Sequence, residues 1–302
     1  MQIEAQSVSI TEVGSRDGFQ NVQTFIATSD KVEIIGGLIK AGLRRLELTS
    51  FVSPKAIPQL ADAAAVCEAV LAEYGDQVHG SALVANLKGA RSAWEAGIRE
   101  VACVVSVSAA HNKANINRTH EQSLAEIAKI IDALPGMAIR VDLATAFACP
   151  FSGWVPADAV EELAAKITAM GVKKLVLADT IGVATPDRVY ALASGLQTEF
   201  NGVQFALHLH DTRGMGLANT LAGIKAGITD FESSVGGLGG CPFAPGAAGN
   251  TATEDMVNML AGMGIDTGVD LTKLLQVVEV VGEKVDAPLS SHMAKAKLYN
   301  WF

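Results

Sequence analysis

The sequence has few cysteines and no long uncharged apolar run. Its four cysteines are widely spaced and none forms a CxxC pair, so neither a disulfide-rich framework nor a thiolate zinc cluster is expected. This usage is typical of a reducing compartment. No apolar segment approaches the roughly 18 residues of a membrane span, and the first residues lack the basic start and apolar core of a secretory signal. We therefore expect a soluble, cytoplasmic protein with no membrane as partner.

Positive charge is also in short supply. The chain has 23 Lys and Arg against 32 Asp and Glu, a formal net charge of -9. This balance argues against a general polyanion-binding surface, so no nucleic acid is expected as a partner, although a local basic spot for a phosphorylated ligand remains open. With 302 residues, of which 49% are hydrophobic, the chain is long enough for one large core or two modest domains.

Short strand-like segments alternate with helix-like segments from one end of the chain to the other. Eight strands are expected, over residues 8–13, 45–48, 79–84, 100–107, 139–146, 174–178, 204–210 and 230–234. Helices are expected over residues 29–41, 58–74, 120–134, 157–170, 186–200, 215–225, 251–263 and 271–285. Glycines 42, 97, 171 and 227 follow helix-like segments, where a left-handed C-cap residue is needed.

Eight βα units without a linker predict an α/β fold of the (β/α)8 TIM-barrel type. We expect one domain over residues 1–302, with the barrel at about 8–265 and a C-terminal helical extension at about 266–302. The alternative is a doubly wound open sheet, which is disfavoured because no GxGxxG follows the first strand.

His208 and His210 stand two residues apart in the segment 204–210. In a strand, residues two apart face the same side, so both imidazoles point to one place while Leu207 and Leu209 pack on the other side. Neutral imidazole is the commonest metal ligand in proteins. Two hydrogen-bonded histidines in a polar core are the alternative interpretation of this pair alone.

Other polar residues gather at the carboxyl ends of the predicted strands, where TIM barrels build their active sites. Asp17 follows the first strand, Asp179 follows the sixth, and Asn250 ends the loop after the eighth. Glu47 alternates with leucines in the second strand, and a buried carboxylate there needs a partner. A set of oxygens and imidazoles favours octahedral Mg²⁺ or Mn²⁺ over a structural zinc site, although zinc remains possible.

The segment 235–250 is glycine-rich and follows the last predicted strand. Such loops often bind phosphate in barrels of this kind, yet this one contains no Lys or Arg. It does contain Cys241, which is either incidental or a proton donor or acceptor beside the metal site.

These residues resemble those of a known family. The segments 12–21, 49–55, 179–182, 208–212 and 234–254 are similar to the hydroxymethylglutaryl-CoA lyases, a branch of the metal-dependent DRE-TIM barrels. The Gly-Gly-Leu-Gly-Gly-Cys-Pro-Phe-Ala-Pro-Gly loop is specific to that branch. The resemblance implies retro-Claisen cleavage of 3-hydroxy-3-methylglutaryl-CoA to acetyl-CoA and acetoacetate, in leucine degradation or a related pathway, and a homodimer.

The resemblance also implies a role for each site residue. The divalent cation, Mg²⁺ or Mn²⁺, is held by Asp17, His208, His210 and Asn250. Asp17 removes the hydroxyl proton with His208 as relay, Arg16 faces the thioester oxygen, and Cys241 protonates the departing carbanion. The supporting residues are Gln20, Glu47, Asp179 and Glu254.

Two segments depart from the family pattern. Phe19 and Gln23 replace a leucine and a lysine, and Ala109 and His111 replace a glutamate and a phenylalanine. The alternative substrate is therefore a longer 3-hydroxy-3-alkylglutaryl-CoA or a citramalyl-like thioester. A condensing acyltransferase is disfavoured because such synthases carry further C-terminal domains. A barrel that binds a CoA ester without cleaving it is also disfavoured, because it would need neither the metal-type residues nor Cys241.

Overall fold

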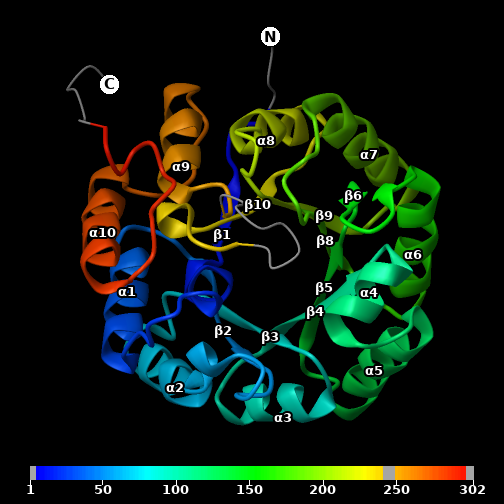
Figure 1. Ribbon diagram of the computed structural model, residues 1–302, viewed down its shortest axis with the longest axis horizontal. Coiled ribbons are helices and arrows are strands. Elements are labelled where there is room, and N and C mark those ends of the chain that lie inside the picture. Colours follow the sequence, from blue (N-terminus) through cyan, green and yellow to red (C-terminus); the bar gives the residue numbers. More distant parts are fainter. Residues whose placement is uncertain (1–4, 241–248, 297–302) are drawn as a thin grey trace.

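A computed structural model describes residues 5–240 and 249–296 of the chain. Eight parallel strands close into a barrel in the order β1-β10-β9-β8-β5-β4-β3-β2, surrounded by helices (Figure 1). The barrel strands are β1 (Ser9–Glu12), β2 (Arg45–Phe51), β3 (His79–Val84), β4 (Glu100–Ser106), β5 (Ala138–Ala144), β8 (Lys174–Asp179), β9 (Gln204–Leu209) and β10 (Asp230–Ser233). The predicted (β/α)8 barrel is thereby confirmed.

Ten α-helices are described. They are α1 (Thr28–Lys40), α2 (Ala63–Tyr74), α3 (Leu87–Glu95), α4 (Ala109–Ile116), α5 (His120–Ala133), α6 (Ala157–Ala169), α7 (Pro186–Glu199), α8 (Gly216–Lys225), α9 (Thr253–Gly262) and α10 (Leu271–Lys284). Gly42 follows α1 with φ +111°, a conformation that L side chains rarely adopt. There is no room for one either, since a Cβ would lie 2.2 Å from the backbone oxygen of Gly268.

The structure differs from the sequence-based expectations in the loops. Residues 109–116, which lie in none of the expected helices, form α4, where the Ser108 hydroxyl accepts a hydrogen bond from the His111 amide at 3.3 Å. The hairpin of β6 (Ala148–Cys149) and β7 (Gly153–Trp154) was not anticipated, because two-residue strands are too short to show an alternating pattern. The helix α3 was anticipated only as the helix-like segment before Gly97, without bounds.

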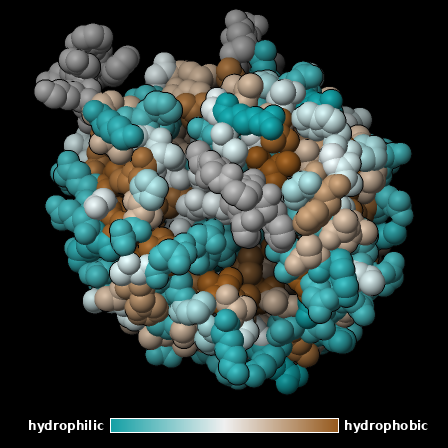
Figure 2. Space-filling view, viewed as in Figure 1, coloured by the Kyte–Doolittle hydropathy of each residue, from teal (hydrophilic) through white to brown (hydrophobic). Residues whose placement is uncertain are grey.

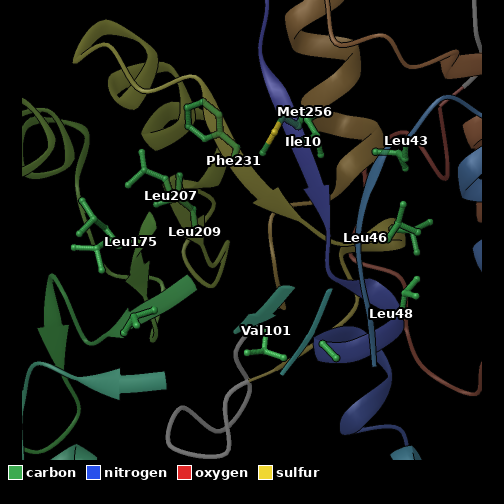
Figure 3. Packing of buried hydrophobic residues seen from close by; sticks show 14 of the residues in the cluster. Ile10, Leu43, Leu46, Leu48, Val101, Leu175, Leu207, Leu209, Phe231 and Met256 are labelled. Atoms are coloured by element: carbon green, nitrogen blue, oxygen red, sulfur yellow. The ribbon is translucent and has the colours of Figure 1, made fainter. Parts of the chain in front are cut away.

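The main hydrophobic core lies between the barrel and its helices. Leu207 and Leu209 of β9 are at most 1% exposed and belong to this core, and Figure 3 shows them with other buried residues, including Phe231 and Met256. Burial of each leucine contributes roughly 2 kcal/mol. A shift of one residue would reverse the two faces of the strand, so this packing fixes His208 and His210 on the inner face.

The C-terminal helix α10 lies beside α1 (Figure 1). Lys284 at its end pairs with Asp30 at 2.7 Å and Glu33 at 2.6 Å. The extension therefore packs against α1 on the outside of the barrel. The start of the extension near residue 266 stays a prediction. No helix in residues 5–240 and 249–296 is long and apolar enough to cross a membrane.

Candidate active site

A cavity of about 630 Å³ opens at the carboxyl end of the strands. Its walls come from the loops after β1, β2 and β3, from α4 and α5, and from the ends of β5, β8 and β9. Figure 2 shows the same face as Figure 1, hollowed near its centre above brown, hydrophobic residues. This is the end of the barrel at which the sequence predicted the site.

Asp17, His208 and His210 meet in this cavity. One ligand-type atom of each lies within 4.8 Å of the others, and all three residues are buried. The Nε2 atoms of the two imidazoles are 3.1 Å apart. The alternation of β9 and the turn after β1 therefore bring together the three residues as the sequence predicted.

Asn250 completes the group. Its backbone forms an antiparallel bridge with His210, its amide nitrogen donates to Asp17 Oδ2 at 2.8 Å, and its buried Oδ1 has no hydrogen-bond partner in the described residues. A Cβ at Gly239, whose φ is +122°, would lie 2.5 Å from the Asn250 amide nitrogen. A glycine is therefore needed where the loop passes over the site.

These residues fit a divalent cation. An orphaned amide oxygen, a carboxylate and two imidazole nitrogens directed at each other form an oxygen and nitrogen donor set of the kind that Mg²⁺ or Mn²⁺ accepts. Thiolate ligands, which would favour structural zinc, are absent from the described cluster.

Arg16 and Asp17 lie in η1 (Gly14–Gly18), a short π-helical turn directly after β1. The Arg16 guanidinium contacts Asp17 Oδ1 at 2.5 Å and Glu47 Oε2 at 2.7 Å, and Gln20 donates to Asp17 Oδ1 at 2.9 Å. Burial alone would raise the pKa of Asp17, but Arg16 and the two histidines outweigh it and lower that pKa to about 2. Asp17 is therefore an anion at neutral pH.

Three charged residues of the site were missed from the sequence. Arg140 and Asp142 of β5 and Glu232 of β10 lie buried inside the barrel. Arg140 pairs with Asp142 at 3.0 Å, with Glu232 at 2.9 Å and with Glu47 at 3.4 Å. The signal was present, since Ile139-Arg140-Val141-Asp142-Leu143 shows the same charged and apolar alternation that singled out Glu47.

The two histidines differ in their electrostatic environment. The His208 Nδ1 lies 2.9 Å from a Glu232 oxygen. Burial opposes the charged form of His208, but Glu232 and Asp17 outweigh it and raise its pKa, whereas burial and the neighbouring His208 lower the pKa of His210 to about 4. His210 is therefore neutral, as a metal ligand must be.

Asp179 and Glu254 hold loop backbone rather than the ligand cluster. The two Asp179 oxygens accept from the amides of Val183 at 3.1 Å and Ala184 at 2.9 Å. Glu254 accepts from the Gly236 amide at 3.0 Å, and its burial raises its pKa to about 7. In the described part of the chain, neither forms a hydrogen bond with another predicted site residue, so both shape the site indirectly.

The comparisons with known proteins agree with this geometry. The HMGL-like family model matches residues 7–281. A hydroxymethylglutaryl-CoA lyase of Bacillus subtilis is 43% identical over 288 residues, which are 95% of this chain and 96% of that protein. The chain belongs to the HMGL-like family.

Two further members of the family are similar over nearly their whole length. The mitochondrial hydroxymethylglutaryl-CoA lyase of Bos taurus is 41% identical over 96% of this chain and 90% of its own. The structure of an HMG-CoA lyase from Acinetobacter baumannii in complex with coenzyme A and 3-methylmalate has a TM-score of 0.92 at 38% identity, with 100% of this chain and 99% of that chain covered.

The four departures from the family pattern have different positions in the structure. His111 is buried and lines the cavity, with its Nδ1 2.7 Å from the Ser106 hydroxyl. Phe19, by contrast, is 0% exposed within the hydrophobic core, and Gln23 and Ala109 are exposed outside the cavity. Of the four departures, His111 is therefore the one that lines the cavity.

Cys241, predicted as a proton donor, lies outside the described residues. So does the rest of the segment 241–248. The described loop before it begins with η3 (Val235–Gly237), whose first amides are bound by buried carboxylates of Glu12 and Glu254.

Proposed function

We propose that the protein is a metal-dependent lyase that cleaves 3-hydroxy-3-methylglutaryl-CoA to acetyl-CoA and acetoacetate. The observation that carries this proposal is the convergence of Asp17, His208, His210 and Asn250 in one buried corner of the cavity, directly beside Arg16. The named activity of the relatives that cover nearly the whole chain supports the same reaction.

The cation, Mg²⁺ or Mn²⁺, would be held by Asp17, His208, His210 and Asn250. When bound, it supplies Lewis acidity to the substrate's tertiary hydroxyl and carboxylate oxygens. Gln20 and Arg16 hold the Asp17 carboxylate from outside the ligand cluster, which fixes its orientation before substrate arrives.

Cleavage begins with the loss of the hydroxyl proton. Asp17 takes this proton, with His208 as the relay that the family resemblance implies. The electron pair of the O–H bond then forms the new ketone of acetoacetate, and the C–C bond breaks. The electrons of that bond form the enolate of acetyl-CoA.

Arg16 stabilises the charge that develops on the thioester oxygen. Its Nε and Nη1 contact Glu47 and Asp17, and the residue lines the cavity beside the proposed metal ligands. A fixed cation in a water-poor pocket is worth more than the same cation in water. Protonation of the enolate carbon is assigned to Cys241, as the family resemblance implies.

A second candidate substrate, a citramalyl-like or longer 3-hydroxy-3-alkylglutaryl thioester, rests on one observation. His111 lines the same cavity as Asp17 and His208, and it presents an imidazole where the family pattern has a phenyl ring. The polar imidazole of His111 at this position favours a substrate whose acyl group is not 3-hydroxy-3-methylglutaryl.

We also propose a place in leucine degradation or a related pathway, a cytoplasmic location and a homodimer. The lyase chemistry and the bacterial relative support the first two, and the family resemblance supports the third. Light scattering on the purified protein tests the dimer, which a monomer mass would contradict.

The activity is tested by acetyl-CoA release from 3-hydroxy-3-methylglutaryl-CoA. Protein stripped with EDTA should be inactive, and Mg²⁺ or Mn²⁺ should restore turnover. Absence of turnover despite bound metal would instead point to another thioester, and absence of metal binding would overturn the mechanism.

A further inference from the structure

Glu232 holds the far side of a proposed metal ligand. It is 3% exposed, and its Oε2 lies 2.9 Å from His208 Nδ1. Its other oxygen, Oε1, pairs with the buried Arg140 guanidinium at 2.9 Å, as an ionised carboxylate does. Because an ionised carboxylate only accepts hydrogen bonds, the Nδ1 atom carries a hydrogen.

Arg140 holds the second oxygen of the same carboxylate. Its Nη1 lies 2.9 Å from Glu232 Oε1, and its Nη2 lies 3.4 Å from Glu47 Oε1. The Arg140 side chain is 1% exposed. Glu232 is therefore fixed between a guanidinium and an imidazole. If its side chain rotated away, Arg140 would lose this ion pair.

These contacts form one network of alternating charge inside the barrel. It begins at one proposed metal ligand and ends at another, and its members in order are Asp17, Arg16, Glu47, Arg140, Glu232 and His208. Loss of a link leaves a buried charge without its partner, which is costly. The orientation of His208 is thus tied to the orientation of Asp17 through four other side chains.

We propose that Glu232 is a positioning residue that locks His208 in the Nδ1–H tautomer, so that the Nε2 lone pair points at the cation, and that Arg140 keeps Glu232 in place. This inference rests on the metal site of the proposed function. Partners of this kind commonly orient imidazole ligands, and their loss typically weakens metal binding about 10- to 100-fold.

The substitution Glu232→Gln makes the sharpest test. Arg140 has only donors, so it binds the oxygen of the new amide and turns the amide NH₂ toward His208. Nδ1 must then accept a hydrogen bond, and the ring hydrogen moves to Nε2, where it blocks the cation. Glu232→Asp keeps a carboxylate opposite both partners and should retain the Nδ1–H tautomer.

Glu100→Gln is the matched control. Glu100 is also a buried barrel glutamate that contacts a histidine, His79, at 2.9 Å. It belongs to the amino end of the strands and to none of the contacts above, so its variant should bind Mn²⁺ within about twofold of the wild type.

Two readouts decide the question without relying on turnover. Mn²⁺ titration calorimetry should show that Glu232→Gln lowers the Mn²⁺ affinity about 10- to 100-fold. The affinity of Glu232→Asp should be within about tenfold of the wild type. Proton–nitrogen correlation spectra of ¹⁵N-histidine-labelled metal-free protein at alkaline pH, where His208 is neutral, with His208→Asn to assign the signal, should show Nδ1–H in the wild type and Nε2–H in Glu232→Gln.

An unchanged tautomer and unchanged Mn²⁺ affinity in folded Glu232→Gln would overturn the inference. If circular dichroism shows that Glu232→Gln does not fold, the Glu232→Asp and Glu232→Asn pair makes the same comparison. A wild type that binds no Mn²⁺ would overturn the proposed function itself, which separates the two failures.

Discussion

The two ends of the barrel contain buried ion pairs of opposite character. At the amino end, Glu100 is surrounded by three basic groups, with His79 at 2.9 Å, Lys174 at 3.1 Å and Arg45 at 3.8 Å. At the carboxyl end, the charged side chains open onto a cavity of about 630 Å³, and the buried oxygen Asn250 Oδ1 has no hydrogen-bond partner among the described residues.

The difference lies in what each cluster leaves available. The carboxylate of Glu100 is fully engaged, because its cations outweigh burial and lower its pKa to about 2. In the carboxyl-end cluster, ligand-type atoms of Asp17, His208 and His210 lie within 4.8 Å of one another, and Arg16 lines the cavity beside them. The same kind of interaction therefore stabilises the fold at one end and prepares a ligand site at the other. Substitutions at the two ends should have separable effects.

The largest expected effect is that of His208→Ala at the carboxyl end. Loss of one cation ligand removes several kcal/mol of charge stabilisation, so kcat for acetyl-CoA release should fall on the order of 1,000-fold or more. The melting temperature of the metal-free protein should also fall, because Ala leaves the buried Glu232 carboxylate without its imidazole partner. Near-normal activity with full metal content would contradict the assignment.

Arg16→Gln should have the next largest effect. Removal of one charge-stabilising donor typically lowers kcat about 100- to 1,000-fold, while Mn²⁺ affinity should fall much less because Arg16 is not itself a ligand. Steady-state kinetics and calorimetry on the same preparation separate the two quantities. A pure KM effect would show that Arg16 binds substrate without stabilising the charge that develops.

Glu100→Gln should act on stability instead of turnover. The lowered pKa, about 2 against 4.5, corresponds to about 3 kcal/mol of unfolding free energy. This stabilisation is present above pH 4.5 and is lost as the pH falls through 2. In urea unfolding, the difference in unfolding free energy between the variant and the wild type should therefore be smaller at acid pH than at pH 7. A lower kcat in the folded variant would contradict the claim that the two ends have separate roles.

His111→Phe should have the smallest effect, on substrate preference. An apolar ring in the cavity should shift the ratio of kcat/KM values toward 3-hydroxy-3-methylglutaryl-CoA over a citramalyl thioester by about tenfold, the scale of one changed apolar contact. The control is Ala109→Glu, since Ala109 is exposed outside the cavity. Equal ratios in wild type and His111→Phe would remove the second candidate substrate.

The sequence predicted the barrel well because its strands and helices follow periodic patterns. The expected strand 204–210 differs from β9 by one residue at its end, and its alternation correctly placed Leu207 and Leu209 outward. The helix α4 was missed because half of its eight residues, which Ser108 caps, are polar and because it lacks an apolar stripe. Short elements of this kind depend on contacts that are distant in the sequence.

The positions of the candidate site residues could be predicted from the sequence, but the partners of the charges inside the strands could not. Glu47 and His208 alternate with leucines within strands, and Asp17 and Asn250 lie in the loops after β1 and β10. Arg140 and Glu232 lie inside strands, where a charge is tolerated only because its partner comes from another strand. That pairing depends on barrel closure, which no local pattern encodes.

The hydrogen bond between Asp17 and Asn250 joins residues that are 233 positions apart. It lies beside the seam where β1 pairs with β10, the last pairing needed to close the barrel. A cation held by these residues binds only the closed seam, so its binding energy adds to the stability of closure, by about 2.7 kcal/mol at a concentration 100 times Kd. Metal supply would thus set how often the first and last strands separate, which amide hydrogen exchange in β1 would report.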